Sequence, residues 1–464
     1  MIEGPAVRAA GARRHGVERA LLDASAGHTA AAFRGTIFFL LLVLPHAFNY
    51  QAVILGLDLK KPAQLAAALA CALSAAVCYL QGAARAPAAM DLWGYSAPPR
   101  TWLAGGDPYD EATLRADVRD RFRGHHPEGA DSEQIANALL PPALVLLAPL
   151  ALLPDEVAPQ IMWLSSMAAL LFSCWAMLRL WAEDWSPAER LWVVALLLQS
   201  RLIQSVAYRG QPSLVMLAAV LCGLLAQRKN ASALAGMALV VAATKFTAAL
   251  PLAAYWVLQR KWRPLCWAAG LGVLLSLPAL FTIGPAALIH GWLDSVRALE
   301  HWNRTPGGFH LTSWSAILDS FFPEGSPWQE AASAALLIAA IALAGWRRPA
   351  SGRAASWRFM TLTALGMIAV YHRAYDAVLL FPAAVLAWEA LRDPAQRSPP
   401  ALVFAGSLLL LLFVLAPQSV AQALSGWLAS RSPLLAPVNA WACIAVFAAA
   451  ALVERRQASS PAIA

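Results

Sequence analysis

The residues of this chain that could do chemistry are a carboxylate and several cations, each near the end of an apolar segment. Asp91 follows the apolar segment 63–83, and a carboxylate there is suited to accept a proton from an attacking hydroxyl group. An ordinary solvated loop acid is the alternative. Arg209 lies between two apolar segments, next to Gln211. Its guanidinium suits a phosphate group, although an arginine that only reaches for the membrane interface would look the same.

Lys245 differs from the other lysines because it lies inside the apolar stretch 231–259. The other four lie in short polar loops: Lys60, Lys61, Lys229 and Lys261. A cation within the membrane is costly and marks a functional site by default. No acid is close to it in the sequence, which favours a function over an ion pair with a neighbouring helix. Because the stretch is short and basic at both ends, we expect two short helices that meet near Lys245, close to Arg209.

A third polar group precedes the apolar segment 377–390 and contains His372, Arg373 and Asp376. The imidazole of His372 and the guanidinium of Arg373 could bind a phosphate or the edge of a sugar. Alternatively, Arg373 and Asp376 form an ion pair at the membrane interface. The sequence leaves these two interpretations equally open.

Side chains that suit a carbohydrate occur mainly in the two long loops, 84–137 and 284–327. Aromatic rings stack on the C–H faces of a sugar, while amides and imidazoles hydrogen-bond its hydroxyl groups. The candidates for sugar or acceptor binding are Tyr95, Tyr109, Gln211, Trp302, Asn303 and His310. His301 and His310 have no third ligand nearby, so we expect neither a metal ion nor another cofactor.

The elements that must position these residues are transmembrane helices. Hydrophobic residues make up 59% of the chain and charged residues only 13%, whereas soluble domains carry about 25% charged residues. The apolar runs are continuous rather than alternating, which favours helices over a β-barrel. The net charge of +8 is spread over short loops, so we expect no nucleic-acid partner. The sequence therefore predicts an all-α polytopic membrane protein.

We expect about 12–13 transmembrane segments, each near the length that spans a bilayer. They are 36–56, 63–83, 155–182, 190–208, 212–227, 231–244, 246–259, 264–283, 328–346, 357–372, 377–390, 399–417 and 434–453. The positive-inside rule puts the short basic loops in the cytoplasm and both long loops outside. The acidic loop 183–190 fits this rule less well, and whether 36–56 spans fully stays open. Segment 138–153 is short and rich in Pro, as in a re-entrant or interfacial helix.

The polar groups converge on the outer end of the predicted bundle. A lipid-linked phosphate donor needs cations where its headgroup meets the protein, because the leaving phosphate gains negative charge as the glycosidic bond breaks. The predicted division of the chain is an N-terminal tail 1–35, an extra membrane segment with a basic loop 36–62, a catalytic core 63–390 and C-terminal segments 391–464.

At these residues the chain resembles the bacterial polyprenol-phosphate-mannose-dependent mannosyltransferases, glycosyltransferase family 87 of the C-type glycosyltransferase superfamily. The matching pieces cover about 60–390 and keep the family's order. They are Asp91 with Tyr95 and the following Ala-Gly-Gly-Asp-Pro-Tyr, the Pro-Pro-Ala-Leu…Ala-Pro-Leu run at 141–150, Gly210-Gln211, Ala235-Gly236 leading to Lys245, and His372. The extra segment 36–56 and the charged insertion 110–137 depart from the pattern, which bears on the substrate more than on the reaction type.

The resemblance implies a C-type glycosyltransferase-like bundle with outer amphipathic loop helices, and an inverting transfer on the periplasmic face of the inner membrane. Asp91 would be the general base, and Lys245 and His372 would hold the donor phosphate. Arg209 and Arg373 are the further candidates for that phosphate. The implied partners are a polyprenyl-phosphate hexose (mannose in this family), a lipid or glycan acceptor, and membrane lipids.

Two other classes of protein stay open. A secondary transporter or flippase would place ionisable groups on discontinuous helices near mid-membrane, which fits Lys245. However, no internal repeat is visible, and the polar groups gather outward. A scaffold of the cell envelope without activity would tolerate mutation of every outer polar residue.

Overall fold

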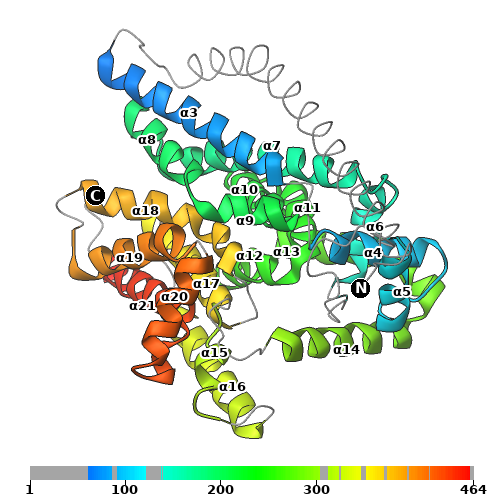
Figure 1. Cartoon of the computed structure of the whole chain (residues 1–464). Coiled ribbons are helices and arrows are strands. Elements are labelled where there is room, and N and C mark those ends of the chain that lie inside the picture. Colours follow the sequence, from blue (N-terminus) through cyan, green and yellow to red (C-terminus); the bar gives the residue numbers. More distant parts are fainter. Residues whose placement is uncertain are drawn as a thin grey trace, which may run out of the picture.

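The computed structural model shows an all-helical chain, which confirms the predicted fold class (Figure 1). It describes residues 61–85, 91–121, 137, 139–303, 312–322, 326–345, 352–369, 374–393, 397–416 and 418–459. The predicted segment 36–56 lies outside the described residues. The helices are α3 (Pro62–Arg85), α4 (Trp93–Leu103), α5 (Glu111–Arg121), α6 (Pro141–Ala151), α7 (Ala158–Trp181), α8 (Pro187–Leu198), α9 (Arg201–Arg209), α10 (Ser213–Arg228), α11 (Ser232–Ala242), η3 (Ala243–Lys245), α12 (Phe246–Leu258), α13 (Trp262–Ile283), α14 (Pro285–Asn303), α15 (Ser315–Leu318), α16 (Pro327–Gly345), α17 (Gly352–Ala369), η4 (Ala374–Leu380), α18 (Phe381–Arg392), α19 (Pro399–Leu409), η5 (Leu410–Val414), α20 (Gln418–Ala429), η6 (Pro433–Leu435) and α21 (Val438–Ser459).

By length and composition alone, five of the described helical stretches are long and apolar enough to cross a membrane: Pro62–Ala84, Ala158–Trp181, Ser232–Leu258 (which is divided at Lys245), Trp262–Ile283 and Val438–Gln457. A sixth candidate is the pair Pro399–Val414 and Ser419–Ala429, which is bent by 116°. Two further apolar helices, α6 and α10, are shorter. In the described part of the chain, full-length spans are therefore fewer than the about 12–13 segments expected from apolar runs.

The predicted segment 190–208 is two helices, because the chain breaks at Gln199 and Ser200. Ser200 caps α9: its Oγ accepts a hydrogen bond from the N–H of Leu202 at 3.3 Å and donates one to the carbonyl of Leu412 at 2.9 Å. A hydropathy pattern does not register such a cap, which explains the error. The break turns α9 into a separate short helix that ends at Arg209.

The chain reverses direction at Lys245, as predicted. A straight helix over 232–258 would be about 40 Å long and would carry Trp256 far from the start of α11. Instead, the indole N–H of Trp256 donates to the side chain of Gln227, which lies just before α11 in the chain. The start of α11 and the end of α12 therefore share one end of the bundle. Lys245 lies at the other end, and 232–258 is a helical hairpin rather than one straight span.

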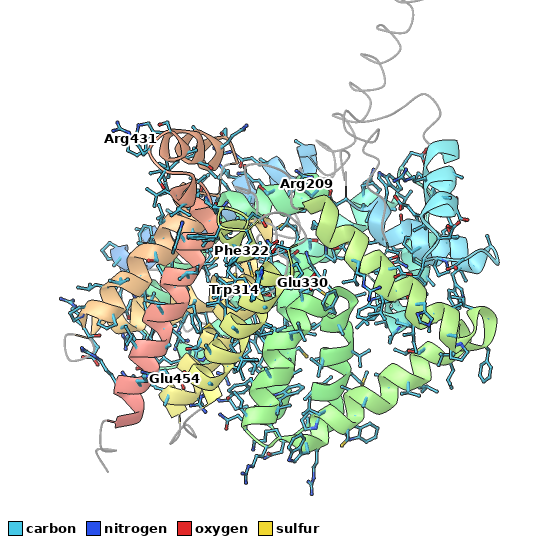
Figure 2. The ribbon with its side chains drawn as sticks, turned by 90° about the horizontal axis from the view of Figure 1, so that it is seen from below. Arg209, Trp314, Phe322, Glu330, Arg431 and Glu454 are labelled. Carbon is cyan, nitrogen blue, oxygen red and sulfur yellow. The ribbon has the colours of Figure 1, made fainter. Side chains whose placement is uncertain are left out.

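The two ends of the helical body are visible in Figure 2, with Arg209 near one and Glu454 at the other. The acidic loop 183–190 lies away from the Arg209 end, beside the C-terminal residue of α10, Arg228. Both Arg228 and Arg392 pair with acids of this loop. Its negative charge is thus compensated within the protein, which explains why it departs from the positive-inside pattern.

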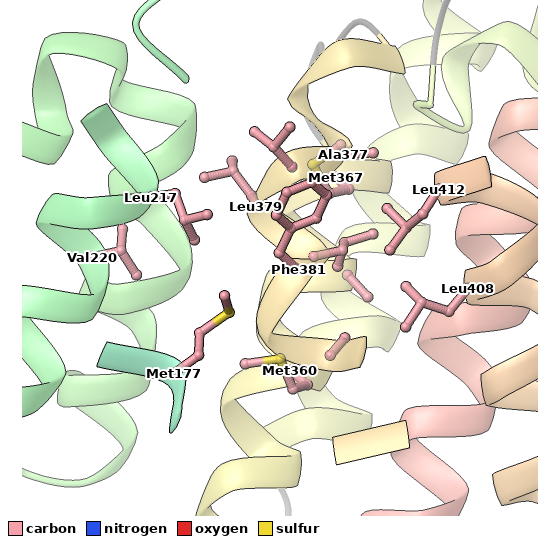
Figure 3. Close-up of a cluster of buried hydrophobic side chains, with 14 of the residues drawn as sticks. Met177, Leu217, Val220, Met360, Met367, Ala377, Leu379, Phe381, Leu408 and Leu412 are labelled. Atoms are coloured by element: carbon pink, nitrogen blue, oxygen red, sulfur yellow. The ribbon is translucent and has the colours of Figure 1, made fainter. Parts of the chain in front are cut away.

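One hydrophobic cluster joins α9, α10 and η4, and part of it is drawn in Figure 3. It brings together Met177 of α7, Leu217 of α10, Met367 of α17 and Phe381 of α18, and Phe381 is fully buried. Close packing of this kind fixes helix ends to within small displacements. The cluster therefore sets the positions of the turn before α10 and of η4, where candidate site residues lie.

Candidate active site

Asp91 and Arg209 are joined twice, although 118 positions separate them. The backbone N–H of Asp91 donates to the carbonyl of Arg209 at 2.7 Å, and Nη1 of Arg209 lies 3.3 Å from Oδ1 of Asp91. The side chains are partly exposed, 20% for Asp91 and 23% for Arg209. The residue that leads into α4 is thus held against the last residue of α9, with its carboxylate still accessible.

Gly210 makes the turn between α9 and α10. Its φ of 65° is left-handed, a conformation that glycine adopts without steric cost. The N–H of Gln211 then returns to the carbonyl of Val206 at 3.0 Å and closes the helix end. The turn places Arg209 and Gln211 on the same short connection, so both side chains reach Asp91.

The buried side chain of Gln211 contacts three other residues of the candidate site. Its Nε2 donates to Oδ2 of Asp91 at 2.7 Å, while its Oε1 accepts from the hydroxyl of Tyr95 at 2.8 Å and from Nζ of Lys245 at 3.4 Å. An ionised carboxylate only accepts and an ammonium only donates, so these partners fix the orientation of the amide. One side chain therefore connects the predicted base to the predicted phosphate-binding lysine.

Lys245 has an acidic partner from a distant part of the chain, contrary to the absence of an acid near it in the sequence. Its Nζ lies 2.5 Å from Oδ1 of Asp376, which also accepts from the hydroxyl of Ser213 at 2.7 Å. The side chain of Lys245 is 15% exposed and that of Asp376 only 2%. Lys245 therefore forms an ion pair, the alternative to a purely functional role in the sequence analysis, and it also contacts Gln211.

Among the residues that the structure describes, the four charged members of the site, Asp91, Arg209, Lys245 and Asp376, sum to zero charge. The accessible members are a carboxylate and two cations, whereas Asp376 and Gln211 support them from the buried side. A base next to fixed cations suits the attack of a hydroxyl on a carbon whose leaving group gains negative charge. No three His, Cys, Asp or Glu side chains in the described part of the chain are grouped to hold a metal ion.

Tyr109, a predicted sugar contact, occupies a packing position instead. Its hydroxyl donates to the carbonyl of Leu139 at 2.9 Å, and a Cβ added to Gly291 of α14 would lie 2.8 Å from its own Cβ. Burial, with the Asp107 carboxylate adding to it, raises the pKa of Tyr109 and keeps this hydroxyl protonated. Tyr109 therefore packs against α14 from the loop 84–137, and it does not contact Gln211 in the hydrogen bonds described above.

Several predicted site residues fall where the structure does not describe their side chains. His310, His372 and Arg373 lie outside the described residues, and Trp302 and Asn303 are described only as the end of α14. Their neighbours in the chain are placed, however. Thr312 donates to the carbonyl of Met367 at 2.9 Å, and the backbone N–H of Trp314 donates to that of Ile368 at 2.9 Å. The end of the outer loop is thus attached to the end of α17, just before His372.

Asp376 and Ser213 are site residues that the sequence analysis did not select. Asp376 belongs to the polar group that precedes the predicted segment 377–390, and Ser213 lies within the predicted segment 212–227. The sequence did contain a signal for the pairing of Asp376 with Lys245. Asp376 directly precedes one apolar segment and Lys245 lies inside another, and a buried charge needs a counter-ion.

Comparison with known proteins gives one family match. Residues 141–371 match the family model described as glycosyltransferase family 87, and this range contains Arg209, Gln211 and Lys245. No curated protein and no solved structure gives a match. The family match and the apolar helices together identify the chain as a membrane glycosyltransferase.

Proposed function

We propose that this glycosyltransferase moves a hexose, with mannose as the first candidate, from a polyprenyl phosphate to a lipid or glycan acceptor with inversion. The observation that carries the proposal is the chain of contacts from Asp91 through Gln211 to Lys245. In it a carboxylate and a cation lie on either side of one amide, at the end of the helical hairpin where Lys245 lies. An acceptor hydroxyl and a donor phosphate need such neighbouring groups of opposite charge.

The proposed reaction is a single displacement. Asp91 takes the proton from the acceptor hydroxyl, the oxygen attacks the anomeric carbon, and the phosphate leaves with the electron pair of the glycosidic bond. Lys245 and His372 stabilise the charge that builds up on the phosphate, and α12 adds the positive end of its dipole directly after Lys245. The sequence suggested Arg209 as a phosphate ligand, but its guanidinium pairs with Asp91. Its main proposed role is therefore to orient the base, and contact with the phosphate is secondary.

The proposed face is the periplasmic one. Arg228 ends α10 and Lys229 follows it, while Arg455 and Arg456 come directly after Glu454, which lies at the end of the bundle opposite Arg209 in Figure 2. By the positive-inside rule that end belongs to the cytoplasm of a bacterial inner membrane, which leaves the candidate site outside. The lipid donor would then reach the site sideways from the bilayer.

The test is a transfer assay with the full chain purified in lipid nanodiscs. Polyprenyl-phosphate donors carrying radiolabelled mannose, glucose or arabinose are incubated with a bacterial membrane lipid extract. The expected result is a labelled product with one of the two hexose donors, mannose or glucose, and inverted anomeric configuration in its NMR spectrum. Retained configuration, or transfer only from nucleotide sugars, would overturn the proposal. Counterflow of a labelled lipid without transfer would favour a transporter or flippase instead.

A further inference from the structure

Asp376 is the most enclosed charge in the candidate site. It lies in the first turn of η4 and accepts hydrogen bonds from Ser213 at 2.7 Å and from Lys245 at 2.5 Å. The residues that follow it, Ala377 and Val378, are completely buried, and Ala377 lies in the hydrophobic cluster of Figure 3. Asp376 is therefore fixed from three directions: by a hydroxyl, by an ammonium and by the packing of its own helix.

Two roles for this carboxylate make opposite demands on the structure. A temporary counter-ion that occupies the place of the donor phosphate must be able to leave Lys245 when the donor arrives. A permanent anchor must stay and hold Lys245 while the phosphate approaches from the accessible side. Moving Asp376 away would take a carboxylate with 2% exposure through apolar packing, which is costly. Lys245, at 15% exposure, keeps surface that a ligand can reach.

We infer that Asp376 is a positioning residue: together with Ser213 it holds the ammonium of Lys245 toward the donor phosphate throughout the reaction. The inference rests on the proposed function, in which Lys245 binds that phosphate. A lysine side chain is a flexible stem, and its ammonium lies closer to Asp376, at 2.5 Å, than to Gln211, at 3.4 Å.

The sign of one mutational effect separates the two roles. Asp376→Asn keeps the shape of the side chain and removes its charge. If Asp376 anchors Lys245, phosphate binding weakens in the variant. If Asp376 competes with the phosphate, the same variant binds phosphate more tightly, because a negative charge has been removed from the site.

The experiment titrates farnesyl phosphate, a short polyprenyl phosphate without sugar, into the full chain in nanodiscs, with farnesol as the uncharged control ligand. We expect Asp376→Asn and Lys245→Ala each to weaken phosphate binding by about tenfold, and the double variant to be no weaker than Lys245→Ala. Asp376→Glu should restore most of the affinity. Glu454→Gln breaks another buried ion pair, with Arg358 at the opposite end of the bundle, and should leave phosphate binding unchanged.

Each outcome decides between the alternatives. Unchanged or tighter binding by Asp376→Asn overturns the anchor while the proposed function stands. Equal loss in Glu454→Gln also overturns it, because the effect then comes from general destabilisation. A wild-type protein that does not distinguish farnesyl phosphate from farnesol overturns both the inference and the proposed phosphate donor.

Discussion

Asp91 meets Arg209 through both its backbone and its side chain, at 2.7 Å from N–H to carbonyl and 3.3 Å from Oδ1 to Nη1. The backbone contact fixes where the chain enters α4, and the ion pair fixes the direction of the carboxylate. A general base works only within hydrogen-bond reach of the proton it removes, so this double attachment is what makes Asp91 a candidate for that role.

Asp91→Asn should abolish sugar transfer and leave the fold intact. The amide keeps the backbone bond to Arg209 and similar volume but cannot take a proton, which should lower kcat by about 10²–10⁴-fold. Initial rates with the labelled donor measure the loss. Asp294→Asn is the matched control, since Asp294 is an exposed acid on α14 that pairs with nearby Arg297. An active Asp91→Asn enzyme would remove Asp91 from the mechanism.

Arg209→Gln should lower kcat by about tenfold or more, because Asp91 loses a charge-assisted hydrogen bond that orients it. Its affinity for farnesyl phosphate should change less than that of Lys245→Ala. Steady-state kinetics and the phosphate titration are measured on the same preparations. A larger loss of phosphate affinity than in Lys245→Ala would return Arg209 to the donor phosphate as its first partner.

The apolar runs predicted much of the helical fold. The basic residues at both ends of the stretch 231–259 predicted the reversal at Lys245. The segment expected at 264–283 is α13, Trp262–Ile283, because continuous hydropathy specifies a lipid-exposed helix. The reversal at Lys245 followed from length and from basic residues at both ends. The break at Ser200 did not follow, since a serine cap changes the hydropathy of a window very little.

The sequence indicated several residues of the candidate site but not the contacts between them. Asp91, Gln211 and Lys245 stood out because polar groups are rare in such a chain. Their connection through one amide, and the pairing of Lys245 with Asp376, depend on how helices pack. Sequence periodicity describes one helix face at a time, so a partner 131 positions away carries no local signal.

Two apolar side chains in place of Lys245 and Asp376 should preserve the stability of the protein but not its activity. Lys245→Met alone removes the ammonium that pairs with the buried carboxylate of Asp376, which should cost about 3–5 kcal/mol of stability. Lys245→Met combined with Asp376→Leu should recover most of that loss, because two apolar side chains replace two charges. Thermal unfolding in detergent, followed by tryptophan fluorescence, reports the stabilities.

The same double variant should stay inactive in the transfer assay, since it has neither the cation nor its anchor. Recovered stability with absent transfer is the expected combination. A double variant whose destabilisation is the sum of the two single losses would show that the residues do not act as a pair. Recovered transfer would exclude Lys245 from donor binding.

The contact between α11 and α13 at Gly236 sets the angle of the helix that delivers Lys245. A Cβ at Gly236 would lie 2.5 Å from Cβ of Trp267 and 2.8 Å from both the backbone N of Ala268 and the carbonyl oxygen of Pro264. Two of these three atoms belong to the backbone and cannot turn aside. Gly236→Ala should therefore push the helices apart and cost about 1–3 kcal/mol.

Gly270→Ala is the matched control for this change. Gly270 lies on α13, and a Cβ added there would have no neighbouring atom within 4 Å among the residues that the structure describes. Alanine at this position should be neutral or stabilise the helix by up to about 1 kcal/mol. Both variants are compared by thermal unfolding and by the donor KM, which should rise only for Gly236→Ala as Lys245 shifts. Equal behaviour of the two variants would show that close packing at Gly236 does not position Lys245.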